Sequence, residues 1–331
     1  MTGRSIDDIF NAFRDRQIMI IGDIMIDSYV WGSVERISPE APVPVIQVKK
    51  KEKRPGGAGN VAKNIQSLGA KPLLCSVIGN DPESRFLLEL LEELGMPTEG
   101  VVSSNSRITS VKERFLSGSQ HILRVDDEHL HDLDQQEKRE LKKRIEKFLP
   151  ECHAVIFEDY DKGVLDKEVI RFVIQLANKL NIPTIVDPKR KNFRHYGQAT
   201  LFKPNLKEIR EGMKIDLEKD DFDGLKKAVK ILREKLEVKS ILATLSDKGV
   251  YYSSIDTDLH FPAHVRTISD VSGAGDTVVS IAALCTSLGL PPGFTASLCN
   301  LGGGIVCEYP GVVAINRERL IEEAKAYGLW E

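Results

Sequence analysis

The sequence predicts an α/β fold with a doubly wound, mostly parallel sheet flanked by helices. Short apolar runs recur along the chain, and helical segments lie between several of them. The runs cover residues 18–21, 154–157, 184–186, 201–202 and 240–244. Polar clusters follow four of them, at 158–162, 187–189, 205–208 and 244–249. Because ligands bind at the carboxyl ends of parallel strands, we expect these clusters to border a ligand site.

Composition narrows the class of partner. The chain has 331 residues with 46 basic and 49 acidic side chains, so its net charge of −3 shows no basic excess for nucleic acid. The apolar runs are shorter than the roughly 20 residues that span a bilayer, and the first residues lack the pattern of a signal peptide. The five cysteines are scattered without metal-ligand spacing. We therefore expect a cytoplasmic protein with reduced thiols, a small-molecule partner, no nucleic acid and no membrane.

The first elements lead toward a candidate site. Apolar residues at positions 6, 9, 10 and 13 follow Ser5 with helical spacing, which predicts a short opening helix. The run 18–21 then ends at Gly22-Asp23, as expected for a central parallel strand. We expect Asp23 and Asp27 to lie at the mouth of this strand.

Two later segments predict a small β lid. Three prolines between residues 38 and 44 exclude a helix and favour an edge strand or an excursion from the main sheet. Residues 108–125 alternate like strands on either side of Gly118-Ser119, which predicts a hairpin.

We expect the lid to cover about residues 28–50 and 106–126. A small two-faced sheet would expose apolar side chains, and pairing two lids would cover them, so we expect a homodimer. The apolar residues expected to be exposed are Val43, Val45, Ile46 and Phe115.

Other segments complete the α/β pattern. Residues 71–94 predict a strand, a turn and an amphipathic helix. A charged helix is expected near 134–148, and an amphipathic surface helix at 317–327.

The most informative stretch is residues 267–280. Gly273, Ala274 and Gly275 precede Asp276 and an apolar run, which predicts a glycine turn at a helix N-terminus. Free N–H groups and the helix dipole favour an anion there, such as a phosphate. A carboxylate in such a place can act as general base toward a hydroxyl that attacks phosphorus. On these residues alone, the alternative is an N-capping Asp after a glycine turn.

Several nucleotide-binding and hydrolase motifs are missing from the sequence. There is no GxxxxGK[ST] motif, and Val278 stands where a dinucleotide fingerprint has its third glycine. Neither a G-x-S-x-G elbow nor an H-E-x-x-H helix occurs.

Two glycine motifs together point to a known family. Gly56-Gly-Ala-Gly-Asn60 and Asp270-Val-Ser-Gly-Ala-Gly-Asp276 resemble, in order and separation, the paired motifs of the ribokinase-like, or PfkB, carbohydrate kinases. Asn205 and Glu208 resemble that family's magnesium and phosphate element. The resemblance runs from about residue 17 to the end. It implies one ribokinase-like kinase domain over residues 1–331, with a β lid, that uses ATP and Mg²⁺.

The resemblance also implies roles for individual residues. Asp276 would be the base, and the amides of Gly273, Ala274 and Gly275 the anion hole. Asn205 and Glu208 would order Mg²⁺ through water. On the ATP side the matching residues are Thr244, Ser246, Gly249, Gly273, Gly275 and Asn300. On the sugar side they are Asp23, Asp27, Gly56, Gly57, Asn60 and Asp159.

A branch of this family is especially similar. Residues 36–45, with 22–27, 54–57, 159–163 and 187–189, look like the heptose 7-phosphate kinases. This implies phosphorylation of the anomeric C1 hydroxyl of D-glycero-β-D-manno-heptose 7-phosphate, a step toward ADP-heptose for lipopolysaccharide. The alternatives are a kinase of another sugar or sugar phosphate, such as fructose phosphate or ribose, and a catalytically silent ligand-binding protein. The chain ends at Glu331 without the HxGH motif of a following nucleotidyltransferase domain, so we expect a stand-alone kinase.

Two departures from the family keep questions open. Met25 stands where many of these sugar kinases have Asn, which leaves the other sugars open. Residues 311–315 replace a more hydroxyl-rich stretch beside the family's monovalent-cation site. Asp270 and Ser272 could still form part of such a site, so dependence on K⁺ is open.

The lid also carries two cations that could bind the substrate's phosphate. Lys112 and Arg114 are two residues apart on a predicted strand and therefore share a face. We expect them to bind the 7-phosphate, and the alternatives are Lys162, Lys189 and Arg124.

Overall fold

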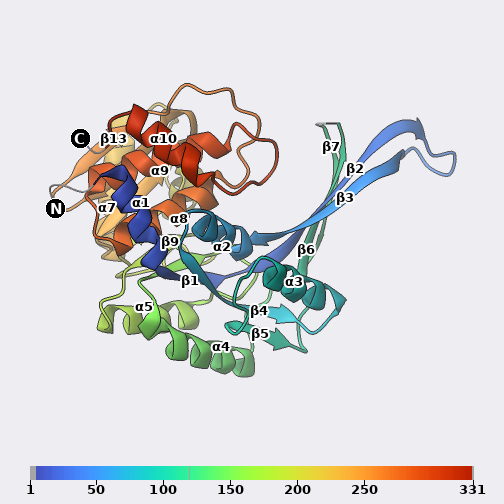
Figure 1. Cartoon of the computed structure of the whole chain (residues 1–331), viewed down its shortest axis with the longest axis horizontal. Coiled ribbons are helices and arrows are strands. Elements are labelled where there is room, and N and C mark those ends of the chain that lie inside the picture. The colour runs from blue at the N-terminus through green and yellow to red at the C-terminus, as the bar shows by residue number, and fades with distance from the viewer. Residues whose placement is uncertain (1–4, 119, 330–331) are drawn as a thin grey trace.

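The computed structural model describes residues 5–118 and 120–329. Among them, one sheet has nine strands in the order β13-β12-β11-β10-β9-β8-β1-β4-β5, and a second has four in the order β3-β2-β6-β7. Figure 1 shows the second sheet reaching away from a body in which helices cover both faces of the first sheet. The predicted fold class, a doubly wound sheet with a β lid, is confirmed.

The large sheet is parallel except at one edge. Its parallel strands are β1 (Gln17–Gly22), β4 (Lys71–Gly79), β5 (Val101–Ser104), β8 (Ala154–Glu158), β9 (Thr184–Asp187), β10 (Leu201–Phe202) and β11 (Ser240–Thr244). The antiparallel edge is β12 (Val250–Ser254) and β13 (Asp258–Phe261), which the sequence analysis did not predict. All the apolar runs listed above are strands, and β1 lies between β4 and β8 as a central strand should.

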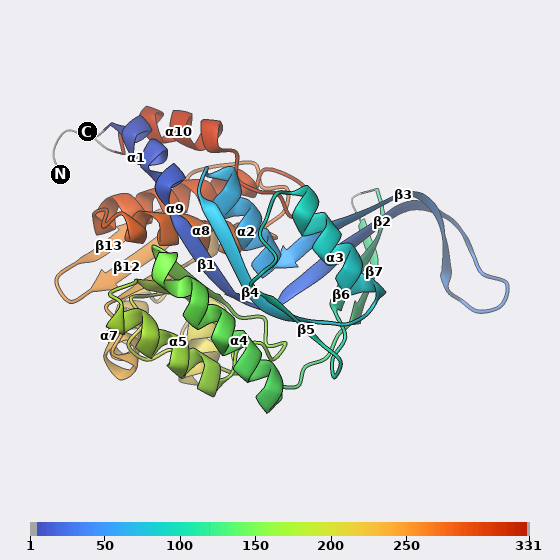
Figure 2. The same cartoon turned by 60° about the horizontal axis from the view of Figure 1, so that its bottom comes forward.

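Alternate residues of the buried strands face two apolar cores. In β1, Ile18 and Ile20 belong to one core, whereas Met19 and Ile21 belong to the other. The helices of the first core are α1 (Ile6–Ala12), α2 (Ala58–Ser67), α3 (Pro82–Glu93), α8 (Ala274–Ser287), α9 (Pro292–Val306) and α10 (Arg317–Ala326). Those of the second are α4 (Gln135–Phe148), α5 (Lys167–Lys179), α6 (Leu206–Met213) and α7 (Phe222–Leu236). Figure 2 shows α4 and α5 side by side beneath the sheet.

The lid is longer than predicted. Its strands are β2 (Ile24–Ile37), β3 (Pro44–Gly57), β6 (Ser110–Ser117) and β7 (Gln120–Asp127). Because β1 ends at Gly22 and β2 begins at Ile24, Asp23 is the single residue between body and lid where the chain first enters the lid. The hairpin is confirmed, although Ser119 lies outside the described residues.

Of the two alternatives predicted for the proline-rich stretch, the edge strand was wrong, and the excursion from the main sheet is what the structure has. Residues 38–43 form the turn between β2 and β3, and only Pro44 belongs to a strand, as its first residue. Proline has no N–H for the ladder, so it is tolerated at a strand start but not inside one.

The exposed apolar residues of the lid differ from those predicted. Val43 is exposed, but Val45, Ile46 and Phe115 are half-buried. The other large apolar side chains exposed on the lid are Ile37, Val48, Leu123 and Val125. Among the described residues, no helix is long and apolar enough to cross a membrane. All five cysteines are buried and free, as expected.

Candidate active site

The glycine turn before α8 is shaped by its lack of side chains. Gly273 is the N-cap of α8 with φ 81°, a conformation that favours glycine, and no side chain caps this helix among the described residues. A Cβ on Gly275 would lie 3.4 Å from Lys203 Nζ and 3.5 Å from Asp187 Oδ2. The amide end of α8 therefore faces a polar site closely. The Ala274 N–H already bonds to the Val271 carbonyl at 3.3 Å, so it is partly committed to the turn.

Asp276 is buried in the first turn of α8. Asn60 Nδ2 donates to its Oδ2 at 2.6 Å, and the Tyr160 hydroxyl donates to its Oδ1 at 3.2 Å. Burial raises the pKa of Asp276 to about 6, against the lowering effect of the Asn60 hydrogen bond, and the charge of Asp187 adds to the rise. A carboxylate with a pKa near neutrality is suited to take and return a proton.

A second asparagine joins the two glycine motifs. Asn64 Oδ1 accepts hydrogen bonds from Thr277 Oγ1 and from the Ile315 N–H, both at 3.0 Å. Its Nδ2 donates to the Asn60 carbonyl at 2.9 Å. These buried contacts hold α2 against α8 and so place Asn60 beside Asp276. The sequence analysis did not single out Asn64, whose only signal is helical spacing, four residues after Asn60.

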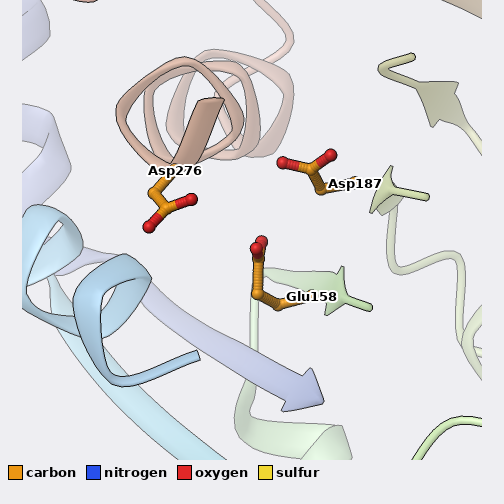
Figure 3. A group of neighbouring side chains, drawn as sticks. All are labelled: Glu158, Asp187 and Asp276. Atoms are coloured by element: carbon orange, nitrogen blue, oxygen red, sulfur yellow. The ribbon is translucent and has the colours of Figure 1, made fainter. Parts of the chain in front are cut away.

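Three buried carboxylates meet at this point (Figure 3). Glu158 at the end of β8, Asp187 at the end of β9 and Asp276 each offer an oxygen within 4.8 Å of the others. Both carboxylate oxygens of Glu158 lack a hydrogen-bond partner among the described residues. Burial, and then the charges of Asp187 and Asp276, raise the pKa of Glu158 well above its usual range.

The positive charge beside the cluster comes from lysines. Lys203 Nζ lies 2.9 Å from Asp187 Oδ2, and both side chains are buried. Because Glu158 still has unpartnered oxygens, the cluster fits a hard cation with oxygen ligands, such as Mg²⁺. The sequence analysis placed Glu158 and Asp187 at the ligand edge of the sheet but missed this chemistry, and it missed Lys203 entirely.

The predicted magnesium pair caps a helix instead of joining this cluster. Asn205 Oδ1 accepts from the Glu208 N–H, and Glu208 Oε2 accepts from the Asn205 N–H, both at 2.8 Å, at the start of α6. Glu208 Oε1 lies 3.2 Å from Lys189 Nζ. Glu208 is therefore linked to the site through Lys189, whose pKa is raised by Asp187, Glu208 and Glu158 in spite of its burial.

On the sugar side, Asp27 and the first glycine motif come together. A Cβ on Gly56 would lie 2.3 Å from Asp27 Oδ2. Gly57 has φ 56°, and a Cβ there would lie 2.4 Å from the Asp23 carbonyl oxygen. Gly57 therefore requires glycine, and a side chain on Gly56 would displace the Asp27 carboxylate. Asp27 also forms an ion pair with Arg114 of the lid.

Asp23 and Asp159 do not present free oxygens to this side. Asp23 accepts three backbone hydrogen bonds, from Tyr160 at 2.9 Å, Lys162 at 3.0 Å and Val164 at 3.1 Å. The oxygens of Asp159 accept from the Asp161 N–H, Asn192 Nδ2 and the Tyr196 hydroxyl. Both carboxylates thus hold the loop 159–164 in place by accepting its N–H groups, and this loop presents Tyr160 to Asp276. Prediction of direct sugar contacts missed this role.

Gly249 and Asn300, two of the residues expected around ATP, both lie against the segment that follows β13. Ser246 and Gly249 both have positive φ, 57° and 83°, and a Cβ on Gly249 would lie 2.0 Å from the Phe261 carbonyl oxygen. They follow Thr244, the last residue of β11. Asn300 Nδ2 donates to the Pro262 carbonyl at 2.8 Å, so it holds the segment leading from β13 toward α8.

Asp270 and Ser272 lie in that same segment. Asp270 Oδ1 accepts from the Ser272 N–H at 2.9 Å, and its Oδ2 accepts from the Gly311 N–H at 3.0 Å. Asp270 therefore connects Ser272 with residue 311, where the sequence departs from the family pattern.

Comparisons with known proteins identify the family of this chain. The model of the pfkB family of carbohydrate kinases matches residues 15–318. Bifunctional protein HldE of Helicobacter pylori strain J99 is 40% identical over 80% of this chain and 57% of its own length. Its namesake in Syntrophotalea carbinolica is 34% identical over 99% of this chain and 67% of its own length. The chain thus spans roughly three-fifths of the curated relatives it matches.

A solved structure shows the same fold at low identity. Phosphofructokinase-2 from Escherichia coli, in complex with potassium, superposes with a TM-score of 0.78 and 19% identity, covering 94% of this chain and 98% of the other. The family match, the two relatives and the paired glycine motifs lead to one conclusion. The chain belongs to the pfkB family of carbohydrate kinases.

Proposed function

We propose that this sugar kinase transfers the γ-phosphoryl group of ATP to the C1 hydroxyl of D-glycero-β-D-manno-heptose 7-phosphate. The observation that carries the reaction type is Asp276, a buried carboxylate with a pKa of about 6 in the first turn of α8. The choice of heptose 7-phosphate as substrate rests on the amino-acid sequence of residues 36–45 and of the shorter matching segments. It also rests on relatives that bear the name HldE.

The chain's own residues account for most of the mechanism. Asp276 takes the proton of the acceptor hydroxyl, while Asn60 and Tyr160 orient its two oxygens. The amides at the start of α8, with Lys203 beside Gly275, stabilise the charge that builds on the transferred group. Glu158 and Asp187 would hold Mg²⁺, which neutralises the phosphate oxygens of the nucleotide when bound. Glu208 would bind a water ligand of the metal rather than the metal itself, and its ion pair with Lys189 holds it beside the site.

The segments around the two ligands divide the site. We assign Asp27, Gly56, Gly57 and Asn60 to the sugar. Thr244, Ser246, Gly249 and Asn300 border the nucleotide. Asp270 and Ser272 are the candidates for a monovalent cation, and K⁺ activation is tested directly by replacing KCl with NaCl in the assay.

The lid cations bear on the substrate's existing phosphate. Lys112 and Arg114 share a face of β6, opposite Asp27 and Tyr29 of β2. In the free protein both are paired with acids, Lys112 with Asp126 and Glu128 and Arg114 with Asp27. A bound phosphate would therefore compete with carboxylates for these cations. Lys112→Ala should raise KM for the sugar phosphate by about tenfold, the loss of one charged hydrogen bond, and leave KM for ATP unchanged.

The deciding experiment is a panel of sugars and sugar phosphates with ATP, followed by NMR of the product. Formation of heptose 1,7-bisphosphate is expected. Activity on fructose 6-phosphate or ribose alone would reject the heptose assignment and keep the sugar kinase. If none of the substrates in the panel causes release of ADP, a catalytically silent ligand-binding protein is favoured.

We also propose a homodimer formed through the lid. The side chains exposed on β2, β3, β7 and their turn are apolar at Ile37, Val43, Val48, Leu123 and Val125. Light scattering should report twice the chain mass, and Leu123→Lys with Val48→Lys should convert it to the monomer mass. A monomer mass for the parent protein would reject this assembly.

A further inference from the structure

Glu128 links the lid to the body through two lysines. It follows the last strand of the lid, β7, and its Oε2 accepts from Lys112 Nζ at 3.2 Å. Its Oε1 accepts from Lys162 Nζ at 2.5 Å. The three side chains are only 12–13% exposed. One carboxylate thus contacts two ammonium groups that come from different parts of the fold, and Lys112 also pairs with Asp126 at 3.3 Å.

Both lysines lie on the sugar side of the site. Lys112 is paired in register with Asp27, whose oxygen lies against the first glycine motif. Lys162 belongs to the loop 159–164, in which Tyr160 donates to Asp276. The two ammonium groups are therefore connected to the acceptor site by short stretches of ordered backbone, one in the lid and one in the body.

A third cation beside Lys162 lacks a full set of partners. Arg107 is 7% exposed, and its Nη2 donates to the Lys162 carbonyl at 2.6 Å. Among the described residues its Nη1 has no hydrogen-bond partner. Arg107, Lys162, Asp23 and Ser110 line one small hollow. The charges of Asp23, Glu137 and Asp132 act on this guanidinium, but its Nη1 is still an unused buried donor beside Lys162 that one more acceptor oxygen would satisfy.

We infer that Glu128 occupies, in the free protein, the place of the phosphate group of the acceptor substrate. A phosphomonoester carries a charge of about −1.5 to −2 and three acceptor oxygens, so it can replace one carboxylate at both lysines. The bridge between lid and body then passes through the substrate. This inference rests on the proposed function, because it requires an acceptor that already bears a phosphate.

Such an arrangement favours phosphorylated sugars over other ligands. A free sugar cannot displace Glu128, so it leaves the lysines paired and the lid attached to its own carboxylate. Inorganic phosphate must displace Glu128 without the contacts that a sugar makes with Asp27 and Asn60. Glu128 is therefore a specificity residue that acts through the two lysines, and it touches neither the transferred phosphoryl group nor the nucleotide.

The test is Glu128→Gln, which keeps the shape and removes the charge. Calorimetric titration with inorganic phosphate should show a Kd lower by about fivefold, the size of one partly buried charge contact. KM for the sugar phosphate should fall by a similar factor, while KM for ATP and for any free sugar stays unchanged. Glu128→Asp keeps the charge but is too short to reach both lysines, so it should give an intermediate Kd.

A matched control separates this effect from general electrostatics. Glu113 lies on the other face of β6, where it accepts from Ser28 Oγ at 3.0 Å. Glu113→Gln removes the same charge and should leave the Kd for inorganic phosphate unchanged.

Several results would overturn the inference. They are an unchanged or weaker affinity of both Glu128 variants for inorganic phosphate, or an equal gain in Glu113→Gln. The phosphate titration needs no sugar, so it decides this point even if the sugar panel rejects the heptose substrate. If Glu128→Gln does not fold, the Glu128→Asp titration decides in the same way.

Discussion

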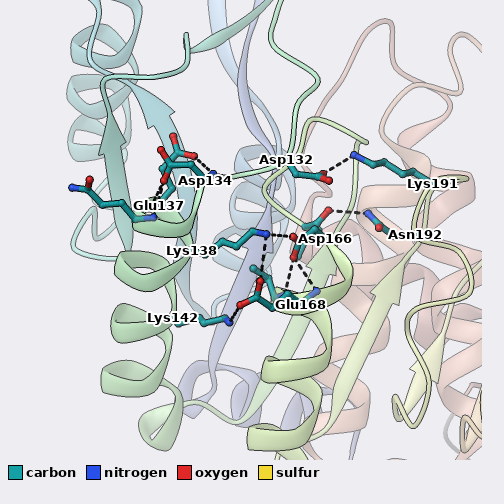
Figure 4. A network of polar contacts seen from close by, with 12 residues as sticks. Asp132, Asp134, Glu137, Lys138, Lys142, Asp166, Glu168, Lys191 and Asn192 are labelled. Carbon is teal, nitrogen blue, oxygen red and sulfur yellow. Dashed lines mark hydrogen bonds and ion pairs between the residues drawn. The ribbon is translucent and has the colours of Figure 1, made fainter.

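Acidic side chains gather in two places in this protein, and their surroundings differ. Between α4 and α5, Lys138 Nζ contacts Asp166 at 2.5 Å and Glu168 at 3.4 Å, and Lys142 Nζ contacts Glu168 at 2.6 Å (Figure 4). At the strand ends, Glu158, Asp187 and Asp276 face one another, and Glu158 has no hydrogen-bond partner among the described residues (Figure 3).

Backbone donors widen the difference. Asp166 caps α5 by accepting from the Glu168 and Val169 N–H groups, and Asp134 and Glu137 complete a capping box on α4. In the buried cluster, by contrast, Asp276 accepts only from the neutral groups of Asn60 and Tyr160. The acids of the α4–α5 network are already compensated and so stabilise the fold. In the cluster, Asp187 pairs with Lys203, whereas the Glu158 oxygens have no hydrogen-bond partner among the described residues, so a proton or a cation is needed to compensate that charge.

The largest expected effect of breaking this contrast is at Asp276. Asp276→Asn keeps the shape and the hydrogen-bonding capacity but removes the base, so kcat should fall by about 10²–10⁴-fold. The Tm should be unchanged or higher, because one of three mutually repelling carboxylates is gone. Turnover within a few-fold of the parent protein would show that another group takes the proton.

The pH dependence should have opposite signs for activity and for stability. Asp276 must be ionised to act, so kcat/KM should rise as the pH increases through about 6. Burial raises the folded-state pKa from 3.8 to about 6, so the contribution of Asp276 to stability is full below about pH 4 and is lost as pH rises through 6.

This loss can reach about 3 kcal/mol by linkage, and metal-free protein should show it in denaturant titrations at several pH values. In Asp276→Asn this part of the pH dependence should disappear. A metal-free protein whose stability rises between pH 4 and 7 would contradict the assignment, unless the Asp276→Asn protein shows the same rise.

Glu158→Gln tests whether the uncompensated charge serves a cation. With one of the two carboxylates assigned to the metal removed, Mg²⁺ affinity should fall by at least about tenfold. Following the Tm during a titration with MgCl₂ measures this without any assay of activity. Glu168→Gln in the α4–α5 network is the matched control and should leave the titration unchanged. Equal titration curves for the two variants would place the cation elsewhere.

The smallest effect is expected in the compensated region. Asp166→Ala removes the N-cap of α5 and an ion pair with Lys138, which should lower the free energy of unfolding by about 1–2 kcal/mol. Urea denaturation measures this loss, and kcat should remain that of the parent protein. A large loss of kcat at full stability would mean that the α4–α5 network reaches the active site.

Local patterns account for the part of the fold that was predicted. The apolar runs identified β1, β8, β9, β10 and β11. A parallel strand that is buried on both faces consists of a short, uninterrupted run of apolar residues, so it can be recognised from a few neighbouring positions. The glycine turn before α8 was also predicted from a local pattern. Glycine tolerates positive φ, and Gly273 adopts a φ of 81°. The bounds of the lid were less predictable, because β2 begins at Ile24, one residue after the end of β1, and its apolar start reads like a continuation of the buried strand.

The sequence by itself thus determined the parallel strands β1, β4, β8, β9, β10 and β11, the glycine motifs and the identity of Asp276 as a candidate base, but not β5 or the antiparallel edge of β12 and β13. Only the tertiary structure decided which polar residues at the strand ends face one another. Glu158 and Asp187 meet Asp276 across the sheet, whereas Asp23 and Asp159 are turned into the loop 159–164. The physical reason is range: periodicity and φ preferences act within about ten residues, but the desolvation and charge that set the pKa of a carboxylate come from segments far apart in the chain.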